Sequence, residues 1–356
     1  MKSYKNLWQQ LISFDNLENA YEKAKKGKLG NPKVLEFAQH WKFHICNLLR
    51  ELRNKTYQPL PLKKFVLRDP KTRVICVSDF RDRVVHHALV NILRPIFEQR
   101  FIHDSFASRK NMGTLPALER FQKFMRRVSR NGKLVQNAKN SNQVVGFALK
   151  CDIKHYFETV DQEILLQIIN ARIKDNNVIW LVKRILENYD SGTIGRGMPL
   201  GNWTSQFFAN IYLNELDQFV KHKLKAKYYL RYVDDFVILH NSKSTLQNYE
   251  KQIQQFLKTL SIELHPNKCK ILPLGQGINF LGFRVFYHYK IVRRRNLRKI
   301  KAKLKMLLDN YQLGSADAYD VLEVLQGWNA YAKNGNTYKL RQNLWGGVRE
   351  KLCMLV

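Results

Sequence analysis

Long segments with helical spacing alternate with short apolar runs, and this alternation sets the expected order of elements. Residues 15–56 repeat apolar positions every three or four residues with a break at 27–32, so they predict two helices. Two short extended runs within 62–79 flank the turn Asp69-Pro70-Lys71 and predict a hairpin. Two further helices are expected between residues 82 and 130.

From residue 144 onward, the chain places acidic residues at a strand end and at a hairpin tip. The apolar run VVGFALKCDIKHYF delivers Asp152 at the end of a strand, and the glycine-rich GTIGRGMPLGNWTSQ opens a later helix. Tyr228 to Tyr232 and Phe236 to Leu239 are typical of the arms of a tight hairpin, with Val233-Asp234-Asp235 at its tip. A strongly basic helix from Arg293 to about Leu308 and a final helical segment complete the chain.

The paired acids Asp234 and Asp235 favour a bound cation, because like charges a few ångströms apart repel. A bare acidic pair in a turn is more often an ordinary polar turn. The strand-end acid Asp152 changes that interpretation, since a strand end and a hairpin tip can together hold two divalent ions. Two such ions serve in-line attack on a phosphate, where hard carboxylate ligands are needed.

The charge balance indicates the kind of partner. Lys and Arg number 61 against 29 Asp and Glu, a formal net charge of +32 spread along the 356 residues. Such an excess favours nucleic acid, because neutralised phosphates release counterions. A membrane surface attracts the same charge, but no amphipathic anchor or long apolar span accompanies it, so no membrane partner is expected.

The cysteines and histidines carry no pattern of a metal site or a disulfide framework. The five cysteines are odd in number, far apart and never in a CxxC pattern, which predicts reduced, mostly buried thiols in a cytosolic protein. The start MKSYKNLWQQ lacks the apolar core of a signal peptide, so a cytoplasmic location is expected. His86 and His87 lack a partner at metal-ligand spacing and are expected to be structural. The cysteines are Cys46, Cys76, Cys151, Cys269 and Cys353.

An ordered series of motifs from about Phe65 to Phe286 resembles a bacterial reverse transcriptase. The motifs are KTRVICVSDFRDRVVHHAL, ASRKNMGT, CDIKHYF, GMPLGNWTSQ, YVDD, HPNKCKI and NFLGF. The resemblance implies an α+β right-hand polymerase fold, with a palm built on an antiparallel sheet with helices. It implies an N-terminal helical extension over 1–62, fingers over 63–150, a palm over 151–286 with interleaved fingers helices at about 161–195, and a short helical thumb over 287–356.

The resemblance also implies the metal and acid–base residues. Asp152 and Asp234 are expected to coordinate two Mg²⁺ ions, with Mn²⁺ as a substitute. Asp235 lies beside them, and the backbone carbonyl of Ile153 is expected to complete the site. Lys268, or its neighbour Lys270, is the expected general acid for the pyrophosphate, and a solvated lysine is the alternative.

Further residues are implied for the incoming deoxynucleotide (dNTP). Phe157 falls at the position that blocks a ribose 2′-hydroxyl, with ordinary core packing as the alternative. Arg73 is expected to clamp the triphosphate, together with Lys64 or Lys63. Gly201 is expected where backbone approaches a nucleotide closely.

The motif from Leu200 to Gln206 departs from most of the superfamily. The common pattern begins with Gln-Gly and ends with Ser-Pro, whereas this one begins with Leu and ends with Ser-Gln. A leucine cannot make the hydrogen bond of the replaced glutamine, so selectivity is expected to relax. This form resembles reverse transcriptases of diversity-generating retroelements, which copy a structured template RNA into cDNA with frequent errors opposite adenine.

That resemblance implies mutagenic retrohoming, in which the altered cDNA replaces part of a target gene, and a small basic accessory protein as partner. The alternatives are a more faithful reverse transcriptase of a retron, an intron or a phage-defence system, and a non-catalytic RNA-binding scaffold. The intact aspartates favour an enzyme.

Basic residues in two places are expected to contact the template RNA and the cDNA/RNA duplex. Arg109 and Lys110 lie in the template-facing motif. The basic helix is expected to follow duplex phosphates by shape, and a solvated basic face is compatible with that role. Its expected contact residues are Arg293, Arg294, Arg295 and Arg298.

Overall fold

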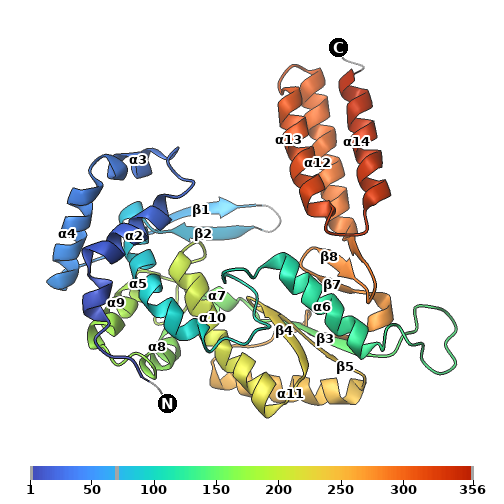
Figure 1. Ribbon diagram of the computed structural model, residues 1–356, viewed down its shortest axis with the longest axis horizontal. Coiled ribbons are helices and arrows are strands. Elements are labelled where there is room, and N and C mark those ends of the chain that lie inside the picture. Colours follow the sequence, from blue (N-terminus) through green and yellow to red (C-terminus); the bar gives the residue numbers. More distant parts are fainter. Residues whose placement is uncertain (1–2, 69–71, 354–356) are drawn as a thin grey trace. The chain divides into compact units, whose positions relative to one another are not determined.

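The computed structural model describes residues 3–68 and 72–353 and mixes α-helices with β-sheets (Figure 1). The chain divides into two compact units, each made of three separate segments. The expected turn at Asp69-Pro70-Lys71 lies outside the described residues. The first unit comprises Met1–Ser108, Cys151–Phe236 and Tyr249–Cys269, and the second comprises Arg109–Lys150, Val237–Asn248 and Lys270–Val356.

The first unit opens with four helices: α1 (Trp8–Leu11), α2 (Phe14–Lys25), α3 (Pro32–Gln39) and α4 (Trp41–Arg53). Ser13 caps α2 by accepting a hydrogen bond from the Asn16 N–H. The second predicted helix is in fact divided at His40, whose φ of −125° and ψ of 32° leave the helical region. The break allows Trp41 to stack on Tyr21, with ring centroids 5.4 Å apart.

A hairpin then leads into a long helix: β1 (Lys63–Leu67), β2 (Arg73–Val77) and α5 (Phe80–Glu98). The two strands pair antiparallel, with Lys64 opposite Cys76, which confirms the predicted hairpin. Asp79 caps α5 by accepting a hydrogen bond from the Arg81 N–H. Helix α5 packs against α2.

The remaining elements of the first unit are α7 (Tyr156–Thr159), α8 (Gln162–Asn170), α9 (Asn176–Glu187), α10 (Trp203–Gln218), a π-helical turn (Phe219–Lys223) and β4 (Tyr228–Tyr232). Asp175 caps α9, and its Oδ2 also accepts the N–H groups of Leu7 and Trp8 at 2.8 and 2.9 Å. These bonds tie the N-terminal segment to α9. Most side chains of α10 are buried, so this helix lies within the core of the unit.

Strands β3 (Phe147–Asp152) and β5 (Asp235–His240) and helix α11 (Lys243–Thr259) each belong partly to both units. With β4 and β6 (Lys270–Pro273), these strands form a sheet in the order β4-β5-β3-β6. Strand β3 pairs antiparallel with β6, with Lys150 opposite Lys270. The run from Phe236 to Leu239 in β5 is fully buried, as expected for an apolar central strand.

The second unit contains α6 (Thr114–Val128), a three-stranded sheet of β7 (Ile278–Phe280), β8 (Phe283–Val285) and β9 (Lys290–Val292), and the helices α12 (Arg294–Gln312), α13 (Ala318–Ala332) and α14 (Tyr338–Cys353). The last three lie side by side (Figure 1) around a core that includes Ile300, Leu304 and Leu325. The predicted basic helix is confirmed as α12, whereas the expected final segment is two helices.

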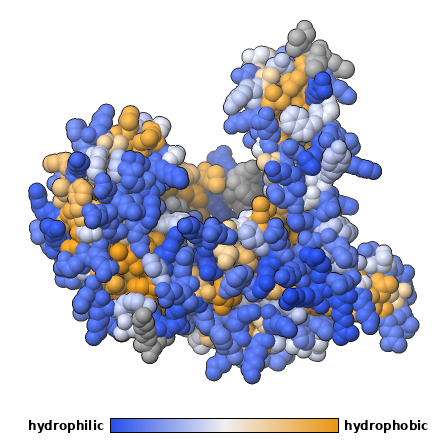
Figure 2. Space-filling model, viewed as in Figure 1, coloured by the Kyte–Doolittle hydropathy of each residue, from blue (hydrophilic) through white to orange (hydrophobic). Residues whose placement is uncertain are grey.

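Hydrophilic residues cover most of the face seen in Figure 2. This agrees with the 61 Lys and Arg residues of the chain, because charged side chains are mostly found at the surface. Within residues 3–68 and 72–353, no helix combines the length and the apolar character needed to cross a membrane.

Candidate active site

Two acids from distant parts of the sequence meet at one cavity of the first unit. Asp152 ends β3, and Asp234 lies in the two-residue turn between β4 and β5. The Ile153 N–H donates to the Asp234 carbonyl at 3.3 Å, which fixes the turn against the strand end. Both acids line a cavity of about 820 Å³. The hairpin tip is shorter than predicted, because Asp235 already belongs to β5. Val233 makes the turn with its backbone in the left-handed region, at a φ of 55°.

The electrostatics of the cavity favour a cation. Burial and the neighbouring Asp152 carboxylate raise the pKa of the half-buried Asp234 to about 6, and the Asp235 carboxylate acts in the same direction. The Lys268 ammonium lies 2.7 Å from Asp152 Oδ1 and opposes this effect. The lining therefore carries three acids, Asp152, Glu158 and Asp234, against two cations, Arg73 and Lys268.

The residues present fit a divalent cation whose remaining coordination positions are filled by water and substrate. Asp152 and Asp234 supply two carboxylates, and Ile153 lines the same cavity. Magnesium commonly binds through one or two carboxylates together with substrate phosphates. Among the described residues, no cluster of three or more His, Cys, Asp or Glu side chains forms a complete metal site. Asp235 is absent from the described lining of the cavity.

A buried arginine, to which the sequence assigned no role, donates a hydrogen bond to the turn that carries Asp234. Arg231 is 0% exposed and bonds Asp217 through Nε at 2.8 Å and Nη2 at 2.6 Å. Its Nη1 donates to the Val233 carbonyl at 3.0 Å and to Asn210 Oδ1 at 3.1 Å. A charged residue inside the apolar run KYYLRY was the available signal, since such a residue is rarely buried without a partner.

The glycine-rich motif forms another wall of the cavity and is fixed to β2. The Cys76 N–H donates to the Leu200 carbonyl at 2.9 Å, and the Ser78 N–H donates to Asn202 Oδ1 at 3.0 Å. Gly201 has a φ of 132°, and a Cβ there would approach the Cys76 carbonyl oxygen to 2.9 Å. The close approach at this glycine is thus to the backbone of β2.

The cavity also gathers several of the expected nucleotide-binding residues. Phe157, Leu200, Gln206 and Arg73 all belong to its lining. Ser108 donates a hydrogen bond to Gln206 Oε1 at 2.9 Å, a contact that the sequence did not predict. The partners of Gln206 and Arg231 became apparent only from the tertiary structure.

The two lysines of β1 are not part of the described lining. Lys64 is exposed on the strand opposite Cys76. Lys63 instead bonds Asp79 Oδ2 at 3.2 Å. The expectation that one of them reaches a triphosphate remains a prediction.

The expected nucleic-acid contacts belong to the second unit. Lys110 is exposed and Arg109 is half-buried. Arg293 precedes α12 and is half-buried, whereas three further arginines, all on the helix, are exposed. These are Arg294, Arg295 and Arg298.

The expectation of reduced cysteines is wrong for two of them. Cys151 and Cys269 form a disulfide, because β3 and β6 run antiparallel and the adjacent residues Lys150 and Lys270 face each other. Cys46 is free and exposed, and Cys76 is free and buried. The side chain of Cys353 lies outside the described residues. The sequence spacing could not anticipate a pair that only strand register brings together.

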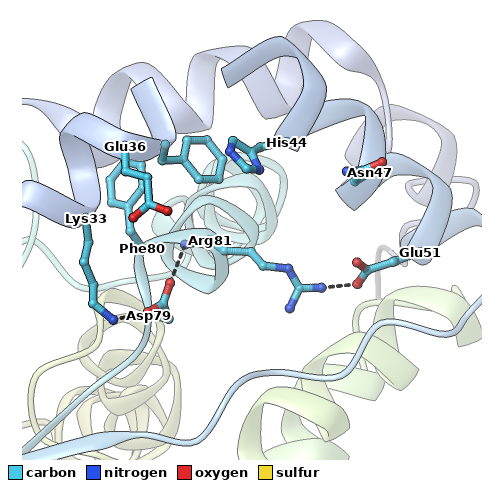
Figure 3. A pocket seen from close by; sticks show the side chains of 9 residues that line it. Lys33, Glu36, His44, Asn47, Glu51, Asp79, Phe80 and Arg81 are labelled. Atoms are coloured by element: carbon cyan, nitrogen blue, oxygen red, sulfur yellow. Dashed lines mark hydrogen bonds and ion pairs between the residues drawn. The ribbon is translucent and has the colours of Figure 1, made fainter. Parts of the chain in front are cut away.

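A second cavity of the first unit, of about 290 Å³, lies where α3 and α4 meet the start of α5 (Figure 3). Lys33 Nζ lies 3.8 Å from Asp79 Oδ2, and Arg81 forms an ion pair with Glu51. Among its aromatic side chains, Phe37 packs edge-on against Phe80, with centroids 5.0 Å apart. These contacts compensate the charges of the two acids and join the helices to one another.

Comparisons with known proteins find similar sequences in bacteria. Protein YkfC of Escherichia coli (strain K12) is 25% identical over 276 residues, covering 66% of this chain and 69% of YkfC. The group II intron-encoded protein LtrA of Lactococcus lactis subsp. cremoris is 26% identical over 332 residues, covering 73% of this chain and 52% of LtrA.

Among solved structures, telomerase from Candida albicans in complex with a fragment of telomeric RNA matches with a TM-score of 0.50 at 15% identity. The match covers 84% of this chain and 55% of the telomerase chain and shows a shared fold. The chain thus spans little more than half the length of LtrA and of this telomerase. Residues 63–285 match the family described as "Reverse transcriptase (RNA-dependent DNA polymerase)".

Proposed function

The chain belongs to the reverse transcriptase (RNA-dependent DNA polymerase) family, and on this basis we propose that it copies a structured template RNA into cDNA with low fidelity. The observation that carries the proposal is a single cavity lined by Asp152, Asp234, Phe157 and Leu200. The first two suit phosphoryl transfer, and the last two bear on which nucleotide is accepted.

In this proposal Asp152 and Asp234 hold two Mg²⁺ ions, with Asp235 beside them and the Ile153 carbonyl as a further ligand. The ions supply Lewis-acid stabilisation of the attacking and leaving oxygens. Lys268 lies next to Asp152, with 2.7 Å between Nζ and Oδ1, and donates a proton to the departing pyrophosphate. Arg73, with Lys64, binds the triphosphate through charge-assisted hydrogen bonds.

The proposed selectivity rests on two side chains with opposite effects. The Phe157 ring excludes a 2′-hydroxyl and so favours deoxynucleotides. Leu200 offers no hydrogen bond to the incoming nucleotide, which weakens a polar check on pairing geometry. Gly201 and Gln206 shape the same wall. This combination supports a DNA polymerase that tolerates mispairs. Such an enzyme is expected in a diversity-generating retroelement, where the errors concentrate opposite template adenines.

The proposed partners follow from the charge and the family. Arg109 and Lys110 contact the template, and the exposed arginines of α12 contact the cDNA/RNA duplex. We assign fingers to 63–150, a palm to 151–286 and a thumb to 287–356, after an N-terminal extension. A small basic accessory protein is proposed to help bind the RNA.

A second candidate is a more faithful enzyme of an intron-like element, favoured by the similarity to LtrA, whose name places it with a group II intron. Primer extension on an RNA template with Mg²⁺, followed by sequencing of the cDNA, separates the candidates. We expect errors to concentrate opposite adenine. A uniform error spectrum refutes the low-fidelity retroelement assignment.

Two variants make this test specific. Asp234→Asn should abolish synthesis, while Asp190→Asn at an exposed position should not. Leu200→Gln should lower the error frequency opposite adenine, with the exposed Leu29→Gln as the matched control. RNA binding without synthesis by the unmodified chain would instead support a non-catalytic scaffold.

A further inference from the structure

A third cavity of the first unit, the α2/α5/α10 cavity, has no part in the proposed chemistry. Its volume is about 620 Å³, and its lining comes from α2, α5 and the first residue of α10. The lining includes two cations and one acid: Lys23, Arg94 and Asp15. Its further polar or aromatic side chains are Asn16, Asn19, His87, Asn91 and Trp203.

Arg94 lines the cavity and forms an ion pair with Glu98, and two of its donor atoms make no hydrogen bond among the described residues. Its Nε and Nη2 atoms are buried, and neither makes a hydrogen bond to the described part of the chain. Glu98 Oε1 lies 3.6 Å from Nε, so the two side chains form an ion pair without a hydrogen bond. The guanidinium lies over the Trp203 ring, with Cζ 4.8 Å from the ring centroid. Stacking therefore holds a planar fork of donors whose geometry suits a phosphate.

Lys23 is held at the same cavity by a series of amide hydrogen bonds. Its Nζ donates to Asn91 Oδ1 at 2.7 Å, and Asn91 Nδ2 donates to Asn16 Oδ1 at 3.0 Å. Asn16 Nδ2 donates in turn to the Leu11 and Ala88 carbonyls at 2.9 and 3.2 Å. Because an ammonium carries several donors, the bond to Asn91 orients the side chain and leaves capacity for a ligand.

The cavity lining holds two cations against one acid, Asp15, and Glu98 forms an ion pair with Arg94 from outside the lining. Burial, followed by Lys28, Lys23, Arg94 and Arg83, lowers the pKa of His87 to about 4. Burial and Arg94 also lower the pKa of Lys23. The His87 ring stacks on Trp203, with centroids 6.0 Å apart, and stays neutral near pH 7. Such crowding of cations is relieved by an anion.

We propose that the α2/α5/α10 cavity binds a phosphate group through Arg94 and Lys23, carried either by an RNA strand or by a free nucleotide. Both sources present the same oxygens to the two cations. The site is independent of the polymerase chemistry, because it uses none of the residues assigned to that chemistry. Trp203, the first residue of α10, lies against the Arg94 guanidinium and offers a local reporter.

The test follows the indole N–H signal of Trp203 in ¹H–¹⁵N spectra of the full chain, assigned with Trp203→Phe. The probes are inorganic phosphate, uridine monophosphate and a 12-residue oligouridine, each titrated at constant ionic strength against chloride. We expect a saturable shift that Arg94→Met and Lys23→Met each weaken about tenfold, the scale of one charge-assisted hydrogen bond. Arg53→Met, which removes an exposed cation from α4, is the matched control and should change nothing.

The outcomes separate the sources and can overturn the proposal. Tighter saturation by the oligouridine than by the monophosphate assigns the site to an RNA strand, and equal or weaker saturation assigns it to a free nucleotide. The absence of a saturable shift with all three probes refutes the proposal. A shift that persists unchanged in both Arg94→Met and Lys23→Met refutes it as well. The two variants are read separately, so that misfolding of one does not decide the result.

Discussion

Replacement of Arg231 by methionine tests whether the buried arginine positions the turn between β4 and β5. The variant leaves Asp217 buried without its cationic partner and removes the donor to the Val233 carbonyl. Breaking a fully buried ion pair by removing one partner costs about 3–5 kcal/mol. That is a large part of the roughly 5–15 kcal/mol that stabilises a typical domain. We therefore expect a clear fall in the midpoint of denaturant unfolding.

A double variant separates stability from positioning. Arg231→Met with Asp217→Leu replaces the whole pair by apolar side chains, which is often neutral for stability. Tyr229 OH loses its acceptor in this variant, since it donates to Asp217 Oδ1 at 2.6 Å. The Val233 carbonyl still loses the arginine donor, so we expect stability to recover in part while primer extension stays low.

Unfolding curves and single-turnover primer extension measure the two effects. A loss below about 1 kcal/mol in Arg231→Met would contradict the assigned cost of the buried pair. Full recovery of activity in the double variant would show that the bond to Val233 does not position Asp234.

Two further predictions concern folding and the glycine motif. Burial lowers the pKa of His86 from 6.5 to about 3, so the unfolded chain binds more protons between these values and His86 should make stability rise with pH by about 1.4 kcal/mol per unit there, in addition to a similar contribution from His87, whose pKa burial lowers to about 4. His86→Asn should reduce this slope by about half in denaturation curves between pH 4.5 and 6.5, with His87 left as the source of the remainder, and an unchanged slope would exclude a contribution from His86. Gly201→Ala should destabilise the chain by about 1–3 kcal/mol and weaken nucleotide use, because its Cβ meets the Cys76 carbonyl at 2.9 Å. Gly327→Ala in α13, where a Cβ meets nothing within 4 Å, should instead be neutral or stabilising, and equal effects in the two variants would contradict the steric argument.

The sequence determined the local elements and the chemical types of the site. Period-two runs and turn residues predicted β1 and β2 and the β4–β5 hairpin, because these patterns depend on neighbours a few residues apart. Asp152 and Asp234 were predicted from their positions at a strand end and a turn. The apolar spacing continues across residue 40 and so predicts one helix, whereas the structure divides it at His40, next to the Trp41 ring that stacks on Tyr21 of another helix.

Contacts between groups far apart in the sequence depend on how the folded elements pack. The pairing of Cys151 with Cys269 follows from the register of β3 and β6, and the bonds of Arg231 follow from the packing of α10 against β4. The contact of Ser108 with Gln206 and the cavity that holds Lys23 and Arg94 likewise join segments far apart in sequence. Spacing along a chain cannot reveal such contacts, because they depend on how buried elements pack and not on local periodicity.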